Sequence, residues 1–436
     1  MQQKEHANRA EGSIRRGSSV QKPVPDARDN NFNIIRLIAS IFVFAGHMEM
    51  IRSGTPLLFS IHSLHEMGVW MLFLISGYLI TKSWLSDPHP LRFAIRRFFR
   101  LWPPFAVMVL IMVFVTGPLL SDNGVQGYFQ SSWWYLYLMN LRFYPVYAQP
   151  GVFTNMIEAY VTNGSLWTMP VETFAYVVTP ILACVYGLGR KKRTAGALLA
   201  SDPSAAAVDA SEQAGSAEPA GAWNGRKPVK SPESAQLNRS NRSFHIAAVV
   251  TAAAIAFDLY LRVCKADAVV VFYGTELIPA YHLITMYIIG VFFTFEQAKK
   301  YLNIQVALVG MCLLIVFESS GVFLQYFLLL MVLPYTVFSF AFAPNAAFSR
   351  FGRKVDLTYG IYLYGFFFQQ LVVYWQNKHG VTYPYTKTLL LSAIPTLLAA
   401  LLSFYLVEKP AQRLCRAILK RMREGEERRK AERRGR

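Results

Sequence analysis

Two ionisable side chains interrupt the first long apolar run of the chain, FNIIRLIASIFVFAGHMEMI. Arg36 and His47 are eleven residues apart in this run. On a helix, eleven residues at 100° each return to within about 20° of the starting direction, so both side chains lie on one face, about 16 Å apart along the axis. Ionisable groups inside a membrane are costly and usually face a bundle interior or a water-filled cavity. The pair is a candidate active site. The alternative is that Arg36 extends to the interface and His47 is a structural polar residue.

A carboxylate stands near the start of a later apolar run, in NGSLWTMPVETFAYVVTP. If that run crosses from outside to inside, Glu172 lies about seven residues, roughly 10 Å, below the outer surface. His47 lies about four residues below the same surface, so the two side chains are predicted at comparable depth. A carboxylate beside an imidazole fixes its tautomer and stabilises its charged form, which suits a general base. The alternative for Glu172 is a structural partner for an arginine or a backbone amide.

A cluster of arginines follows the second apolar run, in RRFFRLWPP. Arg96 and Arg100 are four residues apart and share a helical face, with Arg97 adjacent. Clustered guanidinium groups bind phosphates with forked hydrogen bonds. Anchoring at the cytosolic face of a membrane also places arginines at such a position, so phosphate binding and anchoring both stay open.

A metal site is not predicted. His62, His65 and Glu66 in IHSLHEM lack a third spaced ligand nearby, and the polarity of an exposed loop explains them. The four cysteines are scattered and have no paired spacing, which argues against a zinc site or a disulfide framework.

The elements that must position these residues are membrane helices. Hydrophobic residues make up 53% of the 436, and apolar runs of roughly 18–24 residues recur, the length that crosses a bilayer core of about 30 Å. The predicted fold is all-α, a polytopic bundle of about ten transmembrane helices with both termini cytosolic. The predicted spans are residues 32–51, 66–84, 101–120, 165–188, 245–263, 277–296, 302–320, 322–343, 357–376 and 386–406.

The net charge of +18 supports this topology rather than a nucleic-acid partner. With a cytosolic N-terminus, the cytosolic segments hold about 37 of the 44 Lys and Arg residues, and the outer segments hold about six. This asymmetry is the one that cytosolic loops of membrane proteins show.

Sequence composition divides the rest of the chain. The predicted parts are a cytosolic tail at 1–31, a membrane domain at 32–193 and 243–408, a disordered cytosolic insertion at 194–242, and a basic cytosolic tail at 409–436. The last residues of that tail are predicted to form a helix against anionic headgroups. The aromatic segment 121–164 is either a re-entrant segment or an aromatic belt at the interface.

Six segments in order resemble the membrane acyltransferase-3 family, the bacterial integral-membrane O-acyltransferases. They are RLIASIFVFAGH, GVWMLFLISGYLITKSW, RRFFRLWPPF, GSLWTMPVETFAY, DLTYGIYLYGFFFQQ and FYLVEKPAQR. Together they cover most of residues 31–415. One departure matters. Many relatives carry a histidine shortly after the Tyr-Gly-Ile-Tyr-Leu stretch, where this chain has Gly365, so His47 is the better catalytic candidate and a scheme with two histidines is in doubt.

The resemblance implies O-acyl transfer from an acyl-CoA co-substrate, acetyl-CoA by preference, with no resident cofactor. Arg96, Arg97 and Arg100 are expected to hold the donor phosphates, and Arg36 to line the donor entrance. His47 is expected to act as general base or to carry the acyl group, with Glu172 orienting it. Trp167 and Tyr176 are candidates to line the acceptor site.

The implied partners are a carbohydrate or glycolipid acceptor and membrane lipids, in the bacterial cytoplasmic membrane. A transporter or flippase of a lipid-linked sugar or organic anion is the alternative, with Arg36, His47 and Glu172 as a proton or substrate path. A non-catalytic scaffold is a third reading. The sequence leaves open the acceptor, the acyl group, the side of the membrane on which the acceptor is modified, and the oligomeric state.

Overall fold

The structure is a computed structural model that describes residues 30–59, 62–188, 232–343, 348, 351–352 and 355–434. Each predicted span coincides with a helix of this described chain. These helices are α1 (Phe32–Ser53), α2 (Leu64–Ser86), α3 (Pro90–Ile111), α6 (Thr168–Val185), α9 (Pro232–Cys264), α10 (Leu277–Phe292), α12 (Ile304–Val316), α13 (Val322–Ala341), α14 (Thr358–Lys378) and α15 (Tyr385–Ser403).

Shorter elements fill the connections. They are η1 (Met112–Thr116), α4 (Gly117–Leu120), α5 (Gly124–Gln130), η2 (Trp134–Arg142), η3 (Gly164–Trp167), α11 (Glu296–Lys299), η4 (Phe404–Glu408) and α16 (Lys409–Arg434). Two antiparallel strand pairs complete the fold, β1 (Leu58–Phe59) with β2 (His62–Ser63), and β3 (Val271–Phe272) with β4 (Thr275–Glu276).

The chain is a polytopic helical membrane protein. Within the described residues, seven helical stretches are long and apolar enough to cross a membrane, and α10 and α12 are shorter apolar helices. The total of ten spans and the side on which each terminus lies stay predictions. We refer to the end of the bundle at which α2 ends and α3 begins as the inner end, because the sequence predicts the cytosol there.

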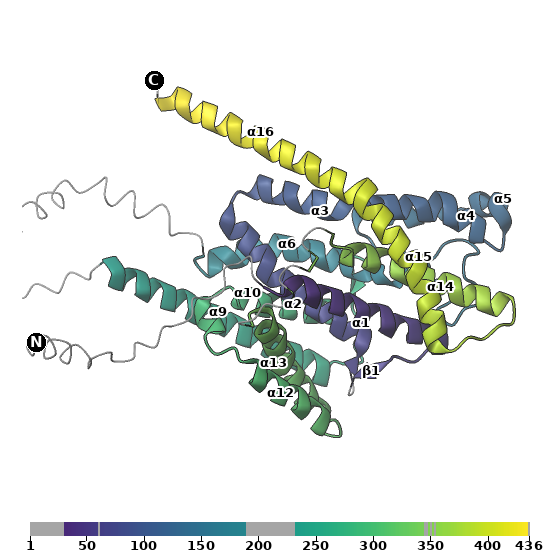
Figure 1. Cartoon of the computed structure of the whole chain (residues 1–436), viewed down its shortest axis with the longest axis horizontal. Coiled ribbons are helices and arrows are strands. Elements are labelled where there is room, and N and C mark those ends of the chain that lie inside the picture. Colours follow the sequence, from purple (N-terminus) through teal and green to yellow (C-terminus); the bar gives the residue numbers. More distant parts are fainter. Residues whose placement is uncertain are drawn as a thin grey trace, which may run out of the picture.

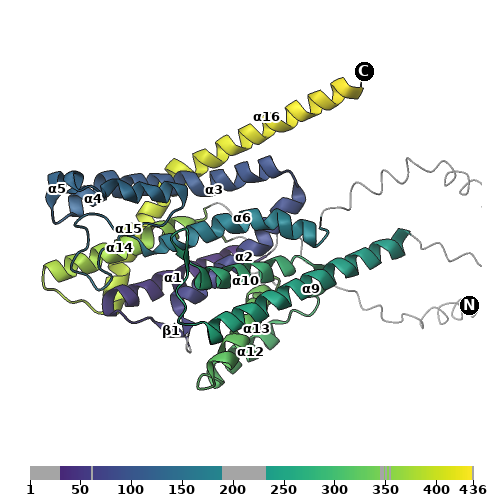
Figure 2. The ribbon, with the colours of Figure 1, turned by 180° about the vertical axis from the view of Figure 1, so that it is seen from behind.

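The centre of the bundle is built by α1, α2, α10 and α14. The helix α1 packs against α2 and α14, while α10 packs on the other side of α2. α15 covers α14, and α12 pairs with α13 at one edge of the bundle (Figure 1). Seen from behind, α4 and α5 lie beyond the end of α3 that is opposite the inner end (Figure 2).

The contact between α2 and α10 depends on two facing glycines. A Cβ added to Gly77 would collide with the carbonyl of Tyr287, and one added to Gly290 would collide with the carbonyl of Leu74. Small residues at such crossings let membrane helices approach closely, which is how they associate where lipid tails compete for apolar contact. The crossing brings the Tyr287 hydroxyl within 2.5 Å of the Thr179 hydroxyl on α6.

The aromatic segment between α4 and α6 enters the bundle. Its described residues form short helices and turns, with no helix of spanning length. Near its end, Asn163 Nδ2 donates to the Leu363 carbonyl at 2.8 Å, and Tyr362 Oη donates to the Ser165 carbonyl at 3.0 Å. Tyr362 and Leu363 are only four and five residues from the inner start of α14, about 6–8 Å of rise. These contacts favour a re-entrant segment over an aromatic belt at the interface.

The C-terminal tail predicted at 409–436 is helical as far as Arg434 and docks on α3. Figure 1 shows α16 running along α3 and then past it. The guanidinium of Arg92 donates to both carboxylate oxygens of Glu426 at 2.6 and 2.7 Å. Residues 1–29 of the predicted tail and most of the predicted insertion at 194–242 lie outside the described residues, although α9 begins at Pro232, inside the range assigned to the insertion.

A buried carboxylate joins α9 to α10 at the outer end. Asp258 Oδ2 lies 2.5 Å from Nδ1 of His282, and both side chains are fully buried. Nε of Arg262, one turn further along α9, points at the same imidazole nitrogen at 2.9 Å. Because Nδ1 has either one proton or one lone pair, it bonds to one of these two groups at a time. The contact fixes the outer end of α9 against α10.

The glycine crossing generates the first prediction. Gly77→Ala places a methyl group where the Tyr287 carbonyl lies, so we expect α2 and α10 to separate and the thermal unfolding temperature in detergent to fall clearly. Gly425→Ala on α16 is the matched control, because no atom lies within 4 Å of its added Cβ. A Gly77→Ala protein as stable as the Gly425→Ala protein would contradict the close crossing.

Candidate functional site

Charged and phenolic side chains from five elements meet in the inner half of the bundle. We call this group the inner polar cluster. Its members are Arg36 of α1, Arg97 and Arg100 of α3, Glu172 and Tyr176 of α6, Asp356 and Tyr359 at the start of α14, and Glu408 of η4. It contains three guanidinium groups and three carboxyl groups, so charges that would be costly in a membrane compensate one another.

Asp356 connects α1 to α3. Its Oδ2 accepts from Nη1 of Arg36 at 2.6 Å and from Nη2 of Arg100 at 3.1 Å. Its Oδ1 accepts from the backbone N–H of Thr358 at 3.2 Å and from the Thr358 hydroxyl at 2.5 Å, at the N-terminus of α14. Burial opposes ionisation, but Arg36, Arg100 and the Thr358 hydrogen bonds hold the pKa of Asp356 well below its usual range. Asp356 is therefore ionised at neutral pH.

Arg100 makes a second ion pair deeper in the cluster. Its Nη1 donates to Oε2 of Glu408 at 3.2 Å, and the Glu408 side chain is 1% exposed. Glu408 comes from the π-helix η4, which joins α15 to α16. The Arg100 guanidinium also lies 5.9 Å from the ring centre of Tyr359. Arg100 is thus bound on two sides by carboxylates and serves mainly to hold helices together.

Arg97 is placed differently from Arg36 and Arg100. Its Nη2 donates to the Ser83 hydroxyl at 2.9 Å, and its guanidinium lies 5.8 Å from the ring centre of Tyr176 and 5.4 Å from that of Phe93. Its buried Nε has no hydrogen-bond partner, and no carboxylate of the described chain lies within ion-pair distance of it. Arg97 is therefore a half-buried cation with free hydrogen-bonding capacity, the property that an anionic ligand requires.

Arg96 faces away from the inner polar cluster. Its Nη1 donates to Asp87 Oδ2 at 2.7 Å. Arg92 and Arg423 donate to the same carboxylate, so Asp87 connects α2, α3 and α16. The hydrogen bonds from Arg92 and Arg96 hold the pKa of Asp87 well below its usual range. The charge of Arg96 is already paired with Asp87, so among the predicted phosphate-binding arginines Arg96 is a weaker candidate than Arg97.

Glu172 does not lie beside His47. Its Oε1 accepts from Tyr176 Oη at 2.5 Å, and the charges that act on it are those of Arg100, Arg36 and Arg97. The predicted pairing with His47 is not seen, because the segment before α6 is hydrogen-bonded to the first turns of α14. Glu172 consequently reaches the level of Arg36, and His47 is about 16 Å further along α1. Tyr176, predicted near the acceptor, also belongs to the inner polar cluster.

His47 lies in an aromatic setting nearer the outer end. Its side chain is 7% exposed, and its ring centre is 5.2 Å from Phe366 and 5.0 Å from His65. The imidazole makes no hydrogen bond with the described part of the chain, so both of its nitrogens are available to a substrate. Gly365 of α14 has Phe44 against its Cβ position, which leaves no room there for the histidine that many relatives carry.

Trp167, the other acceptor candidate, closes the re-entrant segment just before α6. Its carbonyl accepts from the Thr275 hydroxyl at 3.3 Å, and its ring packs on the central core. The structure brings it neither to His47 by a ring contact nor to the inner polar cluster by a hydrogen bond within the described residues. Its role in acceptor binding stays a prediction.

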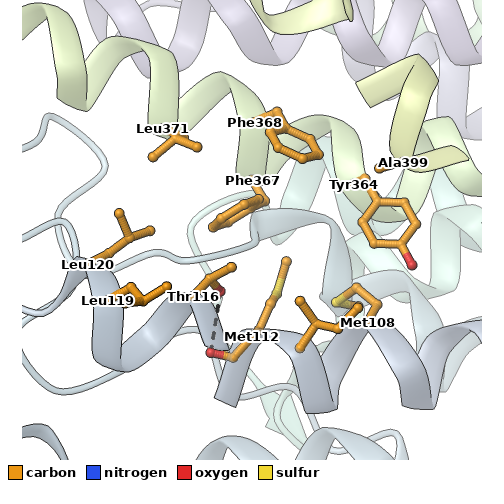
Figure 3. Close-up of a pocket in the computed structure, with 11 residues that line it drawn as sticks. Met108, Met112, Thr116, Leu119, Leu120, Tyr364, Phe367, Phe368, Leu371 and Ala399 are labelled. Atoms are coloured by element: carbon orange, nitrogen blue, oxygen red, sulfur yellow. Dashed lines mark hydrogen bonds between the residues drawn. The ribbon is translucent and has the colours of Figure 1, made fainter. Parts of the chain in front are cut away.

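An apolar groove opens between α3 and α14. It has a volume of about 260 Å³ and lies in the membrane-spanning part of the chain. Figure 3 shows Tyr364 and Phe367 of α14 facing Met108 and Met112 across it. Among the lining residues only Thr116 and Tyr364 carry a hydroxyl, and that of Thr116 bonds to the Met112 carbonyl. The groove can bind a hydrocarbon chain, but its lining contains no histidine, cysteine or carboxylate that could act in acyl transfer.

Sequence reasoning missed the carboxylates that hold the cluster. Asp356 and Glu408 both lie in segments that resemble the acyltransferase family, DLTYGIYLYGFFFQQ and FYLVEKPAQR. Each is the only acidic residue of its segment, at the edge of an apolar run, and that was the available signal. Their partners were not predictable, because Arg36 and Asp356 are 320 residues apart in the chain.

The fold and the site define a class: an integral-membrane protein with a buried charged cluster at one end and a free histidine toward the other. A family model described as an acyltransferase domain matches residues 29–408. The chain therefore belongs to this acyltransferase family, as its motifs indicated, and it is an O-acyltransferase rather than a transporter. No solved structure is significantly similar to it.

Three similar proteins illustrate the family. The O-acetyl transferase of Shigella phage Sf6 is 24% identical over 383 residues, which are 88% of this chain and 96% of that protein. Nodulation protein 10 of Rhizobium leguminosarum bv. viciae is 31% identical over 184 residues, 39% of this chain and 47% of that protein. The peptidoglycan O-acetyltransferase of Listeria monocytogenes is 26% identical over 166 residues, 35% of this chain and 24% of that protein.

The second prediction concerns Asp356. Asp356→Asn leaves two buried guanidinium groups without their shared carboxylate, and we expect a loss of about 3 kcal/mol, at the low end for a broken buried ion pair because the side chain is 23% exposed. Thermal unfolding in detergent measures this loss. Asp267→Asn, in an exposed loop, is the control.

The pH dependence gives this prediction a second test. Because the folded pKa of Asp356 lies below the unfolded value of about 3.9, the carboxylate stabilises the fold fully above that value. Its contribution is lost as the pH falls through the folded pKa. The stability difference between wild type and Asp356→Asn should therefore be constant from pH 5 to 8 and shrink in more acidic buffer. A difference that grows on acidification would contradict the assignment.

Proposed function

We propose that this protein transfers an acyl group, an acetyl group by preference, from acyl-CoA to a hydroxyl of a carbohydrate acceptor. Family membership supports the reaction class. The observation that carries the assignment of a site is His47, which keeps its place in the first-helix motif and has an imidazole free of hydrogen bonds. The proposed location is the bacterial cytoplasmic membrane, with multiple spans.

The donor is proposed to bind at the inner polar cluster. Coenzyme A carries phosphate groups, and Arg97 is the half-buried arginine of the inner polar cluster whose charge is not already paired with a carboxylate in the described chain. Arg100 and Arg36 add positive charge close to it. With the phosphates held there, the pantetheine arm would extend along the face of α1 toward His47, over about 16 Å. This arrangement places the thioester at the histidine and keeps the charged part of the donor at the inner end.

The chemistry at His47 is proposed to be general base catalysis. The imidazole takes the proton from the acceptor hydroxyl as the oxygen attacks the thioester carbonyl. The tetrahedral intermediate then collapses, the carbon–sulfur bond breaks, and the proton passes to the departing thiolate to give free CoA. A transient acyl group on His47 is the alternative route through the same residue. Glu172 is too far inward to orient His47, so we assign it to the donor end beside Tyr176.

The acceptor is proposed to be a surface polysaccharide or a lipid-linked glycan. The relatives' names mention peptidoglycan in one case and nodulation in another, and both support acceptors at the cell envelope or of related chemistry. The apolar groove between α3 and α14, lined by Phe367 and Phe368, would accommodate a hydrocarbon chain, which a lipid-linked acceptor carries. Trp167 remains a proposed acceptor contact.

The third prediction tests His47. In membranes from the producing cells, His47→Ala should reduce transfer of labelled acetyl groups from acetyl-CoA by about 10²-fold or more, the usual contribution of a general base. Thermal unfolding and gel filtration in detergent would confirm the fold. His379→Ala, an exposed histidine at the end of α14, is the matched control and should keep wild-type activity. Full activity in folded His47→Ala protein would refute the catalytic assignment.

The fourth prediction separates two neighbouring arginines. Arg97→Gln should raise the KM for acetyl-CoA about tenfold to a hundredfold, because a charge-assisted hydrogen bond contributes about 1.5–3 kcal/mol. Arg96→Gln is the control and should change this KM by less than about threefold, since its guanidinium is occupied by Asp87. Steady-state kinetics at saturating acceptor measure both values. Equal effects of the two substitutions would argue against a specific role for Arg97.

A further inference from the structure

His65 stands directly beside His47. Their ring centres are 5.0 Å apart with an angle of 33° between the planes. His65 comes from the first turn of α2, and within the described chain it is the only titratable side chain in ring contact with His47. The other ring against His47 is Phe366, which is apolar. Sequence analysis left His47 as a single catalytic histidine, whereas the fold supplies a second one from another helix.

The approach of the two histidines is built into the crossing of α1 and α2. A Cβ added to Gly46, the residue before His47, would collide with the backbone of His65. A Cβ added to Gly68, one turn after His65, would collide with the carbonyl of Ala39 on α1. Glycine at both positions removes the side chains that would separate the helices, so the two imidazoles are held at this distance by the backbone.

His65 also has an oriented carboxylate beside it and a free nitrogen. Glu66 Oε2 accepts from the Ser63 hydroxyl at 2.5 Å, which fixes the carboxylate on the first turn of α2, next to His65 in the chain. The buried Nδ1 of His65 has no hydrogen-bond partner among the residues that the structure describes. Among the described residues, the titratable groups next to His65 are His47 from α1, in ring contact, and Glu66, its neighbour on α2; Phe366 of α14 contacts His47.

We propose that His65 is a second catalytic residue, the general acid of the acyl transfer, and this rests on the proposed function of His47. Two imidazoles this close are not readily both in the cationic form, because like charges repel at short range. In the proposed mechanism the pair carries at most one positive charge, on His65, which has the Glu66 carboxylate next to it on α2, and His47 is the neutral base.

These two residues account for both proton transfers of the reaction. His47 takes the proton of the acceptor hydroxyl as the carbon–oxygen bond forms. His65 gives its proton to the thiolate as the carbon–sulfur bond breaks, so CoA leaves as the thiol. The proton on His47 then returns to His65, directly or through a water molecule, and the pair is ready for another acceptor. No external acid or base is consumed.

The experiment compares His65→Gln with His62→Gln in the full chain, using acetyl-CoA and membranes that contain the acceptor. Glutamine keeps a hydrogen-bond donor but does not titrate in this range. His62 is the control because it lies in the same segment, but its ring packs on Trp70 and Tyr326. Burial, and next Arg262, lowers the pKa of His62 to about 4, so it is neutral at pH 7 and its replacement removes no charge.

The expected result is a fall in kcat of about 10²-fold for His65→Gln, with the KM for acetyl-CoA unchanged. In His65→Gln the pH profile of kcat should lose its alkaline limb, where wild-type activity falls because the general acid deprotonates. His62→Gln should keep both limbs. Glu66→Gln, a milder change, should move that limb to lower pH, because the charged form of His65 loses its stabilising carboxylate. Wild-type kcat in His65→Gln would overturn the proposal, and so would a reduced kcat with both limbs intact, which indicates a structural role.

Comparing His47→Ala with His65→Gln distinguishes a failure of this inference from a failure of the proposed function of His47. If His47→Ala loses activity and His65→Gln keeps it, His47 acts without this partner and the present inference alone is overturned. If His47→Ala keeps activity while His65→Gln loses one limb of the profile, the assignment of His47 is wrong and His65 retains its role as the acid.

Discussion

The ion pairs of Asp356 are the interaction on which the arrangement of the inner half depends. Arg36 and Arg100 come from different helices, and neither could stay charged inside a membrane without a carboxylate close by. Asp356 accepts from both and also from the N-terminus of α14, so one side chain fixes three helices relative to one another. Glu408 completes the neutralisation of Arg100. Arg97 is left with hydrogen-bonding capacity as a consequence.

The re-entrant segment is the second constraint, since it decides which residues meet. Hydrogen bonds of Asn163 and Ser165 with the first turns of α14 carry the chain deep into the bundle before α6 starts. Glu172 therefore joins the arginines, and the space around His47 is left to aromatic rings and to His65. Short helices and turns are tolerated inside the bundle because protein surrounds them and satisfies their polar groups.

Local patterns in the sequence predicted the helices and the face shared by Arg36 and His47, because length, hydropathy and the 3.6-residue period are properties of single segments. Depth was predicted poorly for Glu172, since counting from a loop assumes that a helix begins at the membrane surface. The partner of Arg36 was not predictable, because the contact joins residues 320 positions apart. His65 was assigned from the sequence to an exposed loop, whereas it lies in the first turn of α2, and its neighbour on α1 depends on the Gly46 and Gly68 crossing, which only the packed structure shows.

The two ends of the bundle have electrostatic properties that suit different parts of one reaction. At the inner end, fixed charges compensate one another, and such a network can exchange one partner for a phosphate without exposing a lone charge to the membrane. His47 is buried, with Phe366 and His65 against its ring, so proton transfers there occur in a medium of low dielectric constant, where small changes in geometry have large effects on charge. A donor with an anionic head and a long neutral arm matches this division. The distance of about 16 Å between Arg36 and His47 therefore matters for function. It keeps the charged phosphates away from the imidazoles, whose protonation states the chemistry depends on.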